Sequence, residues 1–267
     1  MGCKCERYIS VYRLYEYKIV RCKDCGLVKT LGKMNVDYND YHRDSDYAKY
    51  TKHFRNIFQK RIDIIERFKK HGRVLEIGAS TGELLSLFAK EGWEVEGVEP
   101  SGVAKIAAGR GLKMYKRSFE KAKLKAGYYD VVVLNHTLEH IEDHFSVMRK
   151  VNKILKKGGI VYVDVPNFGS LSRMIARDQW KYLLPEEHVW HFERHTLEGV
   201  LAEGGFDILW WGSWSGIFDV SNKLEHFRLA WKERKVAFAA DIIEVPNNIF
   251  STALKMGTNL AVVGRKK

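Results

Sequence analysis

The sequence lacks any apolar run long enough to cross a bilayer, and its first residues lack the apolar segment of a secretory signal. Crossing takes about 18 or more consecutive apolar residues, and no such stretch occurs. The N-terminal stretch MGCKCERYIS is polar and carries two cysteines. We therefore expect a cytoplasmic protein without a membrane span.

Cysteine is absent after residue 25, so every thiol belongs to one short segment. The four cysteines form two close pairs, Cys3 with Cys5 and Cys22 with Cys25. Paired thiolates on either side of an alternating, hairpin-like segment are typical of a tetrahedral Zn²⁺ site, and Gly26 follows as in a knuckle turn. The first pair is spaced C-x-C rather than C-x₂-C. We predict a zinc ribbon over residues 1–32, structural because four thiolates leave no open position.

Acidic residues are outnumbered: 45 Lys and Arg face 33 Asp and Glu, which gives a net charge of +12. The basic residues are scattered, with only short clusters such as KKHGR and LKKGG. A solvated, lysine-rich surface is favoured, and a nucleic-acid interface stays open as an alternative. With 267 residues, 45% of them hydrophobic, the chain suits one large globular domain plus a small module.

Residues 33–72 are predicted to form a polar, tyrosine-rich connecting segment that ends in a helix over 54–71. Beyond residue 73, short apolar runs alternate with helical patterns, which predicts βαβ units and a parallel sheet covered on both faces. The runs are VLEIG, VEGVEP, YDVVVLNH and IVYVDVP, and the helical patterns span 83–91, 101–110 and 144–157. After an aromatic and histidine-rich insertion near 167–192 come a helix over 196–203, a strand FDILWWGSW, a helix near 221–244 and a strand NLAVVGRK.

The glycine loop in RVLEIGASTGELL lacks two glycines of the dinucleotide pattern G-x-G-x-x-G. Counted from Gly78, the second glycine position is Ser80 and the third is Glu83, at the start of a helix where a pyrophosphate would bind. Glu76 adds a second carboxylate before the loop. Repulsion between these groups and a phosphate amounts to several kcal/mol in partly desolvated surroundings. NAD, FAD and ATP are therefore disfavoured.

A phosphate-free, cationic nucleoside suits this loop better, and S-adenosylmethionine carries both a sulfonium and an ammonium group. Glu99 falls at the end of the second strand, where an acidic residue binds ribose hydroxyls in nucleotide-binding folds. The loop and the acid together predict S-adenosylmethionine as the cofactor.

Four stretches, VLEIGASTG, VEGVEPS, YYDVVVLNHTLEHIED and LKKGGIVYVDVPN, resemble the motifs of class I S-adenosylmethionine-dependent methyltransferases. EEHVWHFERHTLEGVLAEGGF resembles the branch called methyltransferase domain 23, and CKDCGLV resembles zinc-ribbon-bearing sugar C-methyltransferases, although the likeness does not extend to the C-terminal domain of those enzymes. The resemblance covers residues 70–265 and, more loosely, 1–30. It implies a Rossmann-like α/β fold with a seven-stranded sheet, an antiparallel last strand and helices on both faces, over residues 73–267.

The resemblance also implies a set of cofactor contacts. Glu99 would bind the ribose, and Asn135 and His136 would face the methyl group. The full set is Glu76, Gly78, Ala79, Ser80, Gly82, Glu99, Pro100, Ser101, Ser118, Phe119, Asn135 and His136.

For catalysis, the resemblance points to the adjacent pair Glu187 and His188, with His188 as general base and Glu187 as an orienting or substrate contact. Packing of the insertion onto the sheet explains His188 equally well, so both interpretations stay open. His136 and His140 have the four-residue spacing of a helical metal pair, but His136 falls at a strand end, and we expect no metal there.

The sequence thus predicts an enzyme that methylates an oxygen or carbon of a small molecule, a sugar or another metabolite. An rRNA or tRNA methyltransferase is the first alternative, because it would use the basic surface and the zinc ribbon. The fourth-strand motif Asn135-His136-Thr137-Leu138 differs from the [D/N]-P-P-[F/Y] of base amino-group methylation. A non-catalytic zinc-ribbon scaffold is the second alternative, and the sequence does not indicate an oligomeric state.

Overall fold

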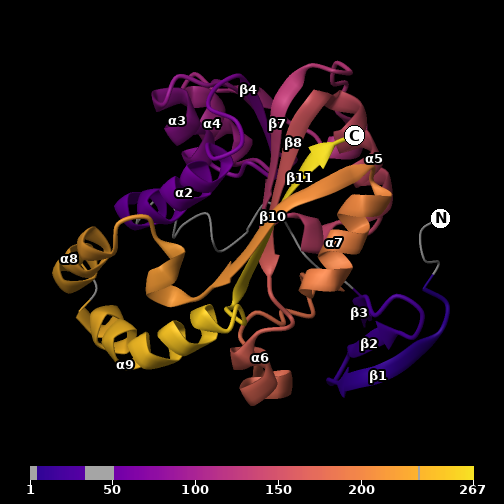
Figure 1. Ribbon diagram of the computed structural model, residues 1–267, viewed down its shortest axis with the longest axis vertical. Helices are drawn as coiled ribbons and strands as arrows, with labels where there is room; N and C mark the ends of the chain where they lie inside the picture. The colour runs from indigo at the N-terminus through magenta and orange to yellow at the C-terminus, as the bar shows by residue number, and fades with distance from the viewer. Residues whose placement is uncertain (1–4, 34–50, 234) are drawn as a thin grey trace.

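The computed structural model describes residues 5–33, 51–233 and 235–267. Cys3 and residues 34–50 of the predicted connecting segment lie outside these residues. Two sheets organise the described chain, one of seven strands and one of four (Figure 1).

The seven-stranded sheet has the order β10-β11-β8-β7-β4-β5-β6. Neighbouring strands from β8 to β6 run parallel, whereas β11 is antiparallel to both β8 and β10. The expected sheet with an antiparallel last strand is therefore confirmed. The strands are β4 (Arg73–Ile77), β5 (Glu94–Val98), β6 (Lys113–Tyr115), β7 (Tyr129–Asn135), β8 (Leu155–Pro166), β10 (Phe206–Trp214) and β11 (Asn259–Lys266).

Helices cover both faces of this sheet (Figure 1). On one face lie α2 (Thr51–Ile65), α3 (Glu83–Lys90) and α4 (Ala104–Gly109), and on the other α5 (His144–Ile154) and α7 (Arg194–Glu203). Successive residues of β7 enter opposite cores: Val131 and Val133 join one apolar cluster, and Val132 and Leu134 join the other. This alternation explains the near-continuous apolar run of the central strand.

One helix prediction is wrong. In place of a single helix near 221–244, the chain forms α8 (Lys223–Glu233) and α9 (Lys235–Ala253), and α9 continues through Pro246. Proline removes a helical hydrogen bond, so sequence patterns end a helix before it. Here the turn after the proline is anchored by Ser251, whose hydroxyl oxygen lies 3.3 Å from both Asn248 O and Ser215 Oγ. Within the described residues, no helix has both the length and the hydrophobicity that crossing a bilayer requires.

The small sheet joins the N-terminal segment to the insertion. Its strands β1 (Tyr8–Arg13), β2 (Lys18–Cys22) and β3 (Val28–Leu31) form the predicted hairpin and a third strand. The fourth is β9 (Trp190–His191), which pairs antiparallel with β3. No pattern in the sequence predicts this pairing, because β9 is only two residues long. The N-terminal segment therefore packs directly on the chain around residue 190, beside the helix α6 (Leu171–Ala176) of the same insertion.

Candidate functional site

A tight glycine turn follows β4. Gly78 and Gly82 have φ angles of 75° and 76°, and a Cβ at position 78 would lie 2.5 Å from Thr137 Oγ1. Only glycine adopts this conformation without strain, and only glycine leaves room for Thr137. Ser80 also takes a left-handed conformation, with φ of 44°, although it is not glycine. The turn brings the Ser80 amide to the end of β5.

That amide meets the carboxylate of Glu99. Glu99 Oε2 accepts from the Ser80 N–H at 3.0 Å, and Oε1 accepts from the Ser101 N–H at 2.9 Å. The side chain is 8% exposed, so its orientation is fixed by backbone donors on both sides. Each carboxylate oxygen retains a further lone pair for a ligand hydroxyl.

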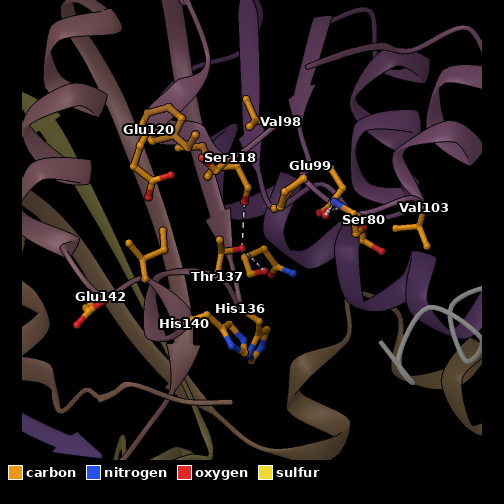
Figure 2. A pocket seen from close by; sticks show the side chains of 17 residues that line it. Ser80, Val98, Glu99, Val103, Ser118, Glu120, His136, Thr137, His140 and Glu142 are labelled. Atoms are coloured by element: carbon orange, nitrogen blue, oxygen red, sulfur yellow. Dashed lines mark hydrogen bonds between the residues drawn. The ribbon is translucent and has the colours of Figure 1, made fainter. Parts of the chain in front are cut away.

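The turn and Glu99 border a cavity of about 300 Å³ at the carboxyl ends of β4, β5 and β7. This is where ligands bind in open parallel α/β sheets. In Figure 2, Ser80, Glu99 and Val103 lie on one side of it, Glu120 and Glu142 on the opposite side, and His136 and His140 at a third edge. We call Gly78, Ser80, Glu99 and Ser101 the glycine-loop end.

Nine of the twelve residues predicted to touch a cofactor line this cavity. They are Gly78, Ser80, Glu99, Pro100, Ser101, Ser118, Phe119, Asn135 and His136. Glu76, Ala79 and Gly82 are buried in or beneath the turn and are not part of the lining. Contact of all twelve with a cofactor stays a prediction.

The charges beneath the glycine turn differ from the expected pattern. Glu83 faces Arg110 and lies 3.5 Å from Arg55 Nε, so its charge is compensated within the protein. Glu76 is buried, and its Oε2 has no hydrogen-bond partner among the described residues. Burial, and then the charge of Glu99, raise the pKa of Glu76 well above its usual value. A phosphate would therefore be repelled mainly by the carboxylate of Glu99, whereas a cationic ligand would favour ionisation of Glu76.

Asn135 is oriented by a buried arginine that sequence reasoning missed. Arg61, on α2, is 1% exposed, and its Nη2 lies 2.9 Å from Asp164 Oδ2. Asp219 accepts from the same guanidinium, and Arg61 Nε donates to Asn135 Oδ1 at 3.4 Å. The signal in the sequence was a lone arginine on the apolar face of a predicted helix. A buried charge of this kind is expected to have such partners.

Four side chains gather at and behind the third edge of the cavity, and we call His136, Glu139, His140 and His188 the histidine end. His140 Nδ1 lies 3.0 Å from Glu187 O, and His188 Nδ1 lies 3.0 Å from Tyr182 O. The two rings meet edge to face with centroids 4.8 Å apart. His140 lines the cavity, whereas His188 is 1% exposed and is not part of the lining. The assignment of His188 as base and Glu187 as its partner stays a prediction.

Glu139 lies at the centre of this group. It is 1% exposed, and His136 Nδ1 is 3.6 Å from its Oε1. Burial raises the pKa of Glu139, but the adjacent imidazoles, His136 first, outweigh it and hold the pKa at about 2. The carboxylate is thus ionised although it is buried.

The N-terminal cysteines also come together. Cys5, Cys22 and Cys25 have their sulfur atoms within 4.8 Å of one another, and Cys5 Sγ lies 3.5 Å from Cys25 Sγ. Gly26 has a φ of 77° and donates its N–H to Cys22 O, as expected for a knuckle turn. The donor set suits Zn²⁺, but Cys3 lies outside the described residues, and zinc binding stays a prediction.

Comparison with known proteins agrees with this geometry. The family model Methyltransf_23, described as a methyltransferase domain, matches residues 47–209, more than half of the chain. A ubiquinone biosynthesis O-methyltransferase from Escherichia coli O7:K1 is 34% identical over 120 residues, which are 42% of this chain and 50% of that enzyme. The chain therefore spans about half the length of this curated relative.

Solved structures share the fold at low sequence identity. A methyltransferase from Thermotoga maritima, described as a possible histamine N-methyltransferase, has a TM-score of 0.56 and 18% identity, covering 84% of this chain and 95% of that one. Phosphoethanolamine N-methyltransferase 2 from Haemonchus contortus, in complex with S-adenosyl-L-methionine, has a TM-score of 0.62 and 18% identity, covering 90% of this chain and 62% of that one.

Proposed function

The chain belongs to the methyltransferase-domain family as a class I S-adenosylmethionine-dependent enzyme, and we propose that it methylates a hydroxyl group of a small molecule. The observation that carries the proposal is the cavity between the glycine-loop end and the histidine end. At the glycine-loop end, the carboxylate of Glu99 is held by backbone donors and favours a positively charged ligand. At the histidine end, imidazole rings line the cavity.

The glycine-loop end holds the cofactor in this proposal. S-adenosylmethionine supplies a methyl group on a positively charged sulfur. Glu99 accepts hydrogen bonds from the ribose hydroxyls, and the positive charge of the cofactor lowers the raised pKa of the buried Glu76. Pro100, Ser101, Ser118 and Phe119 border the adenine. Asn135, oriented by Arg61, faces the methionine part together with His136.

The histidine end serves the acceptor. Methyl transfer requires the acceptor oxygen to lie in line with the methyl carbon, in a site that excludes water. His188, with Glu187 beside it, is the sequence's candidate to remove the hydroxyl proton. His188 is not part of the cavity lining, and its ring packs against that of His140, which is, so His140 is the imidazole of this pair that the acceptor hydroxyl reaches directly. An oxygen acceptor is supported by the relatives that are named as O-methyltransferases.

We also propose a structural Zn²⁺ on Cys3, Cys5, Cys22 and Cys25. The sheet that begins there reaches the histidine end, because Thr30 Oγ1 donates to His188 O at 2.7 Å and Thr30 N donates to Val189 O. Zinc would stabilise this sheet and thereby the His188 segment. Metal analysis of the purified chain should find about one zinc per chain bound by thiolates.

Calorimetric titration tests the cofactor assignment. The wild type should bind S-adenosylmethionine and not NADH, and Glu99→Ala should weaken binding by about 100-fold or more, because it removes hydrogen bonds to a charged group. Glu94→Ala is the matched control, since Glu94 lies on the same strand and its side chain is 68% exposed. Equal binding by all three proteins would refute the assignment.

Transfer of a labelled methyl group tests the acceptor class. Hydroxylated aromatic compounds and sugars should yield methyl ethers, which survive mild base. If the labelled methyl group instead enters total RNA and is released by ribonuclease, the alternative of an rRNA or tRNA methyltransferase is favoured.

A further inference from the structure

We propose that Glu139, His140 and His188 bind a divalent metal ion at the acceptor end of the cavity. Each residue offers one ligand atom, and these atoms lie within 4.8 Å of one another. The sequence had paired His140 with His136, but the structure brings His188 from the insertion to His140 instead. A role for the ion in methyl transfer rests on the proposed function, whereas ion binding itself does not.

The hydrogen bonds of both imidazoles fix their tautomers. A backbone carbonyl only accepts, so the Nδ1 atoms that face Glu187 O and Tyr182 O carry the protons. The lone pair of each ring is then on Nε2. Metal-binding histidines show this arrangement, in which the second ring nitrogen donates to a carbonyl and orients the ligand.

Glu139 supplies the negative ligand. Neither of its carboxylate oxygens has a hydrogen-bond partner within the described part of the chain, although the side chain is almost completely buried. His136 Nδ1 lies 3.6 Å from Glu139 Oε1, and if its imidazole is neutral the buried charge is costly unless another cation compensates it. Its backbone is also fixed to the insertion, because Val189 N donates to Glu139 O at 2.9 Å. Ligands from two distant segments are thus held in one place without the ion.

The position of the site suggests what the ion does. His140 lines the cavity, so an ion bound to its ring would lie next to the space where the proposed function places the acceptor. Two imidazoles and one carboxylate are the donor set of catalytic sites for Zn²⁺ and Fe²⁺, and Mn²⁺ accepts the same ligands. An ion there would lower the pKa of the acceptor hydroxyl, so that the acceptor binds as the alkoxide and its proton stays in the bulk solvent. His188 would then act as a ligand rather than as a general base.

Titration with Mn²⁺ tests the site directly. The full chain, with the proposed cysteine-bound zinc kept in place, is dialysed against a weak chelator and then against metal-free buffer, and it is titrated while the spin-resonance signal of aqueous Mn²⁺ is recorded. Mn²⁺ prefers nitrogen and oxygen ligands, so the cysteine cluster does not compete. We expect one bound ion per chain. Glu139→Gln and His140→Ala should each weaken Mn²⁺ binding by about 100-fold or more. Loss of a residue that only supports a ligand from the outer shell weakens metal binding by less than this.

The controls separate ligand loss from misfolding. His195→Ala removes an exposed imidazole from the same part of the chain and should bind Mn²⁺ like the wild type. His140 is only partly buried, so His140→Ala should retain the thermal unfolding transition of the wild type. Wild-type protein that binds no Mn²⁺, or variants that bind it as well as the wild type, would overturn the proposal.

A parallel titration with S-adenosylmethionine, in chelator, distinguishes the two proposals. Cofactor binding and methyl transfer without any Mn²⁺ binding would refute the metal site and leave the proposed function intact. Mn²⁺ binding that depends on Glu139 and His140, with no methyl transfer to any acceptor, would support the metal site and count against the proposed function.

Discussion

The glycine-loop end and the histidine end face the same cavity, but the residues that hold each end in place are separated by very different distances along the chain. At the glycine-loop end, Glu99 bonds to the amides of Ser80 and Ser101, which lie 19 and 2 residues away. At the histidine end, His140 bonds to Glu187, which is 47 residues away, and the carbonyl of His188 bonds to Thr30, which is 158 residues away. One end is built by a single strand–turn–helix–strand unit, and the other by three distant segments.

This difference determines how each end responds to mutation. The glycine-loop end depends on backbone conformation, so a single added methyl group disrupts it. The histidine end depends on side chains whose positions are set by the small sheet and the insertion. Changes there should alter catalysis or stability while the cofactor still binds.

Gly78→Ala should have the largest effect. It adds left-handed strain and a clash with Thr137, and should lower the free energy of unfolding by about 2–5 kcal/mol and abolish cofactor binding. Gly92→Ala is the matched control, because Gly92 has a φ of 84° but no atom within 4 Å of the added carbon. In urea unfolding, Gly92→Ala should lower the free energy of unfolding by only about 1–2 kcal/mol, the cost of the left-handed conformation. Equal losses in the two variants would mean that the contact with Thr137 is unimportant.

His188→Ala should separate the two ends most clearly. Turnover should fall by about 100-fold or more, because the substitution removes either the general base or a metal ligand. The affinity for S-adenosylmethionine should stay nearly unchanged. Steady-state kinetics and calorimetry on the same preparation measure both quantities. Unaltered turnover would mean that His188 only packs the insertion against the sheet.

The same difference explains what the sequence could predict. Gly78, Ser80 and Glu99 lie within one motif, and the alternation of strands and helices predicts the sheet that places them, so the glycine-loop end followed from local patterns. The pairing of β3 with the two-residue β9 has no local signal, and neither has the approach of His188 to His140. Arg61 was visible only as a charge on an apolar helix face, and its partners Asp164 and Asp219 lie more than 100 residues away.

The free energy of unfolding should fall at acidic pH because of His144, which packs beside the histidine end. Its ring packs against Trp190 and Phe192, and burial lowers its pKa from 6.5 to about 4, while Asp143 raises and Lys29 lowers it by smaller amounts. The folded state therefore disfavours protonation, so the stabilising contribution is complete above pH 6.5 and is lost as the pH falls towards 4. Between pH 7 and 5 the free energy of unfolding should fall by about 2 kcal/mol from this group. His144→Phe should lose that much less over the same interval in urea unfolding, and an identical pH dependence would contradict the assignment.

The smallest effect is expected where the small sheet meets α7. Arg21 forms a two-point ion pair with Glu193, whose side chain is 18% exposed, and also donates to Gly26 O. Arg21→Met should lower the free energy of unfolding by about 1 kcal/mol, because a partly exposed pair is screened by water. Arg7→Met is the control, since the pair of Arg7 with Asp24 is exposed and joins only the N-terminal segment to itself. If the small sheet positions His188, Arg21→Met should also lower turnover more than Arg7→Met does, with the affinity for S-adenosylmethionine equal in both. Equal turnover would show that β3 alone, through Thr30, suffices to hold the His188 segment.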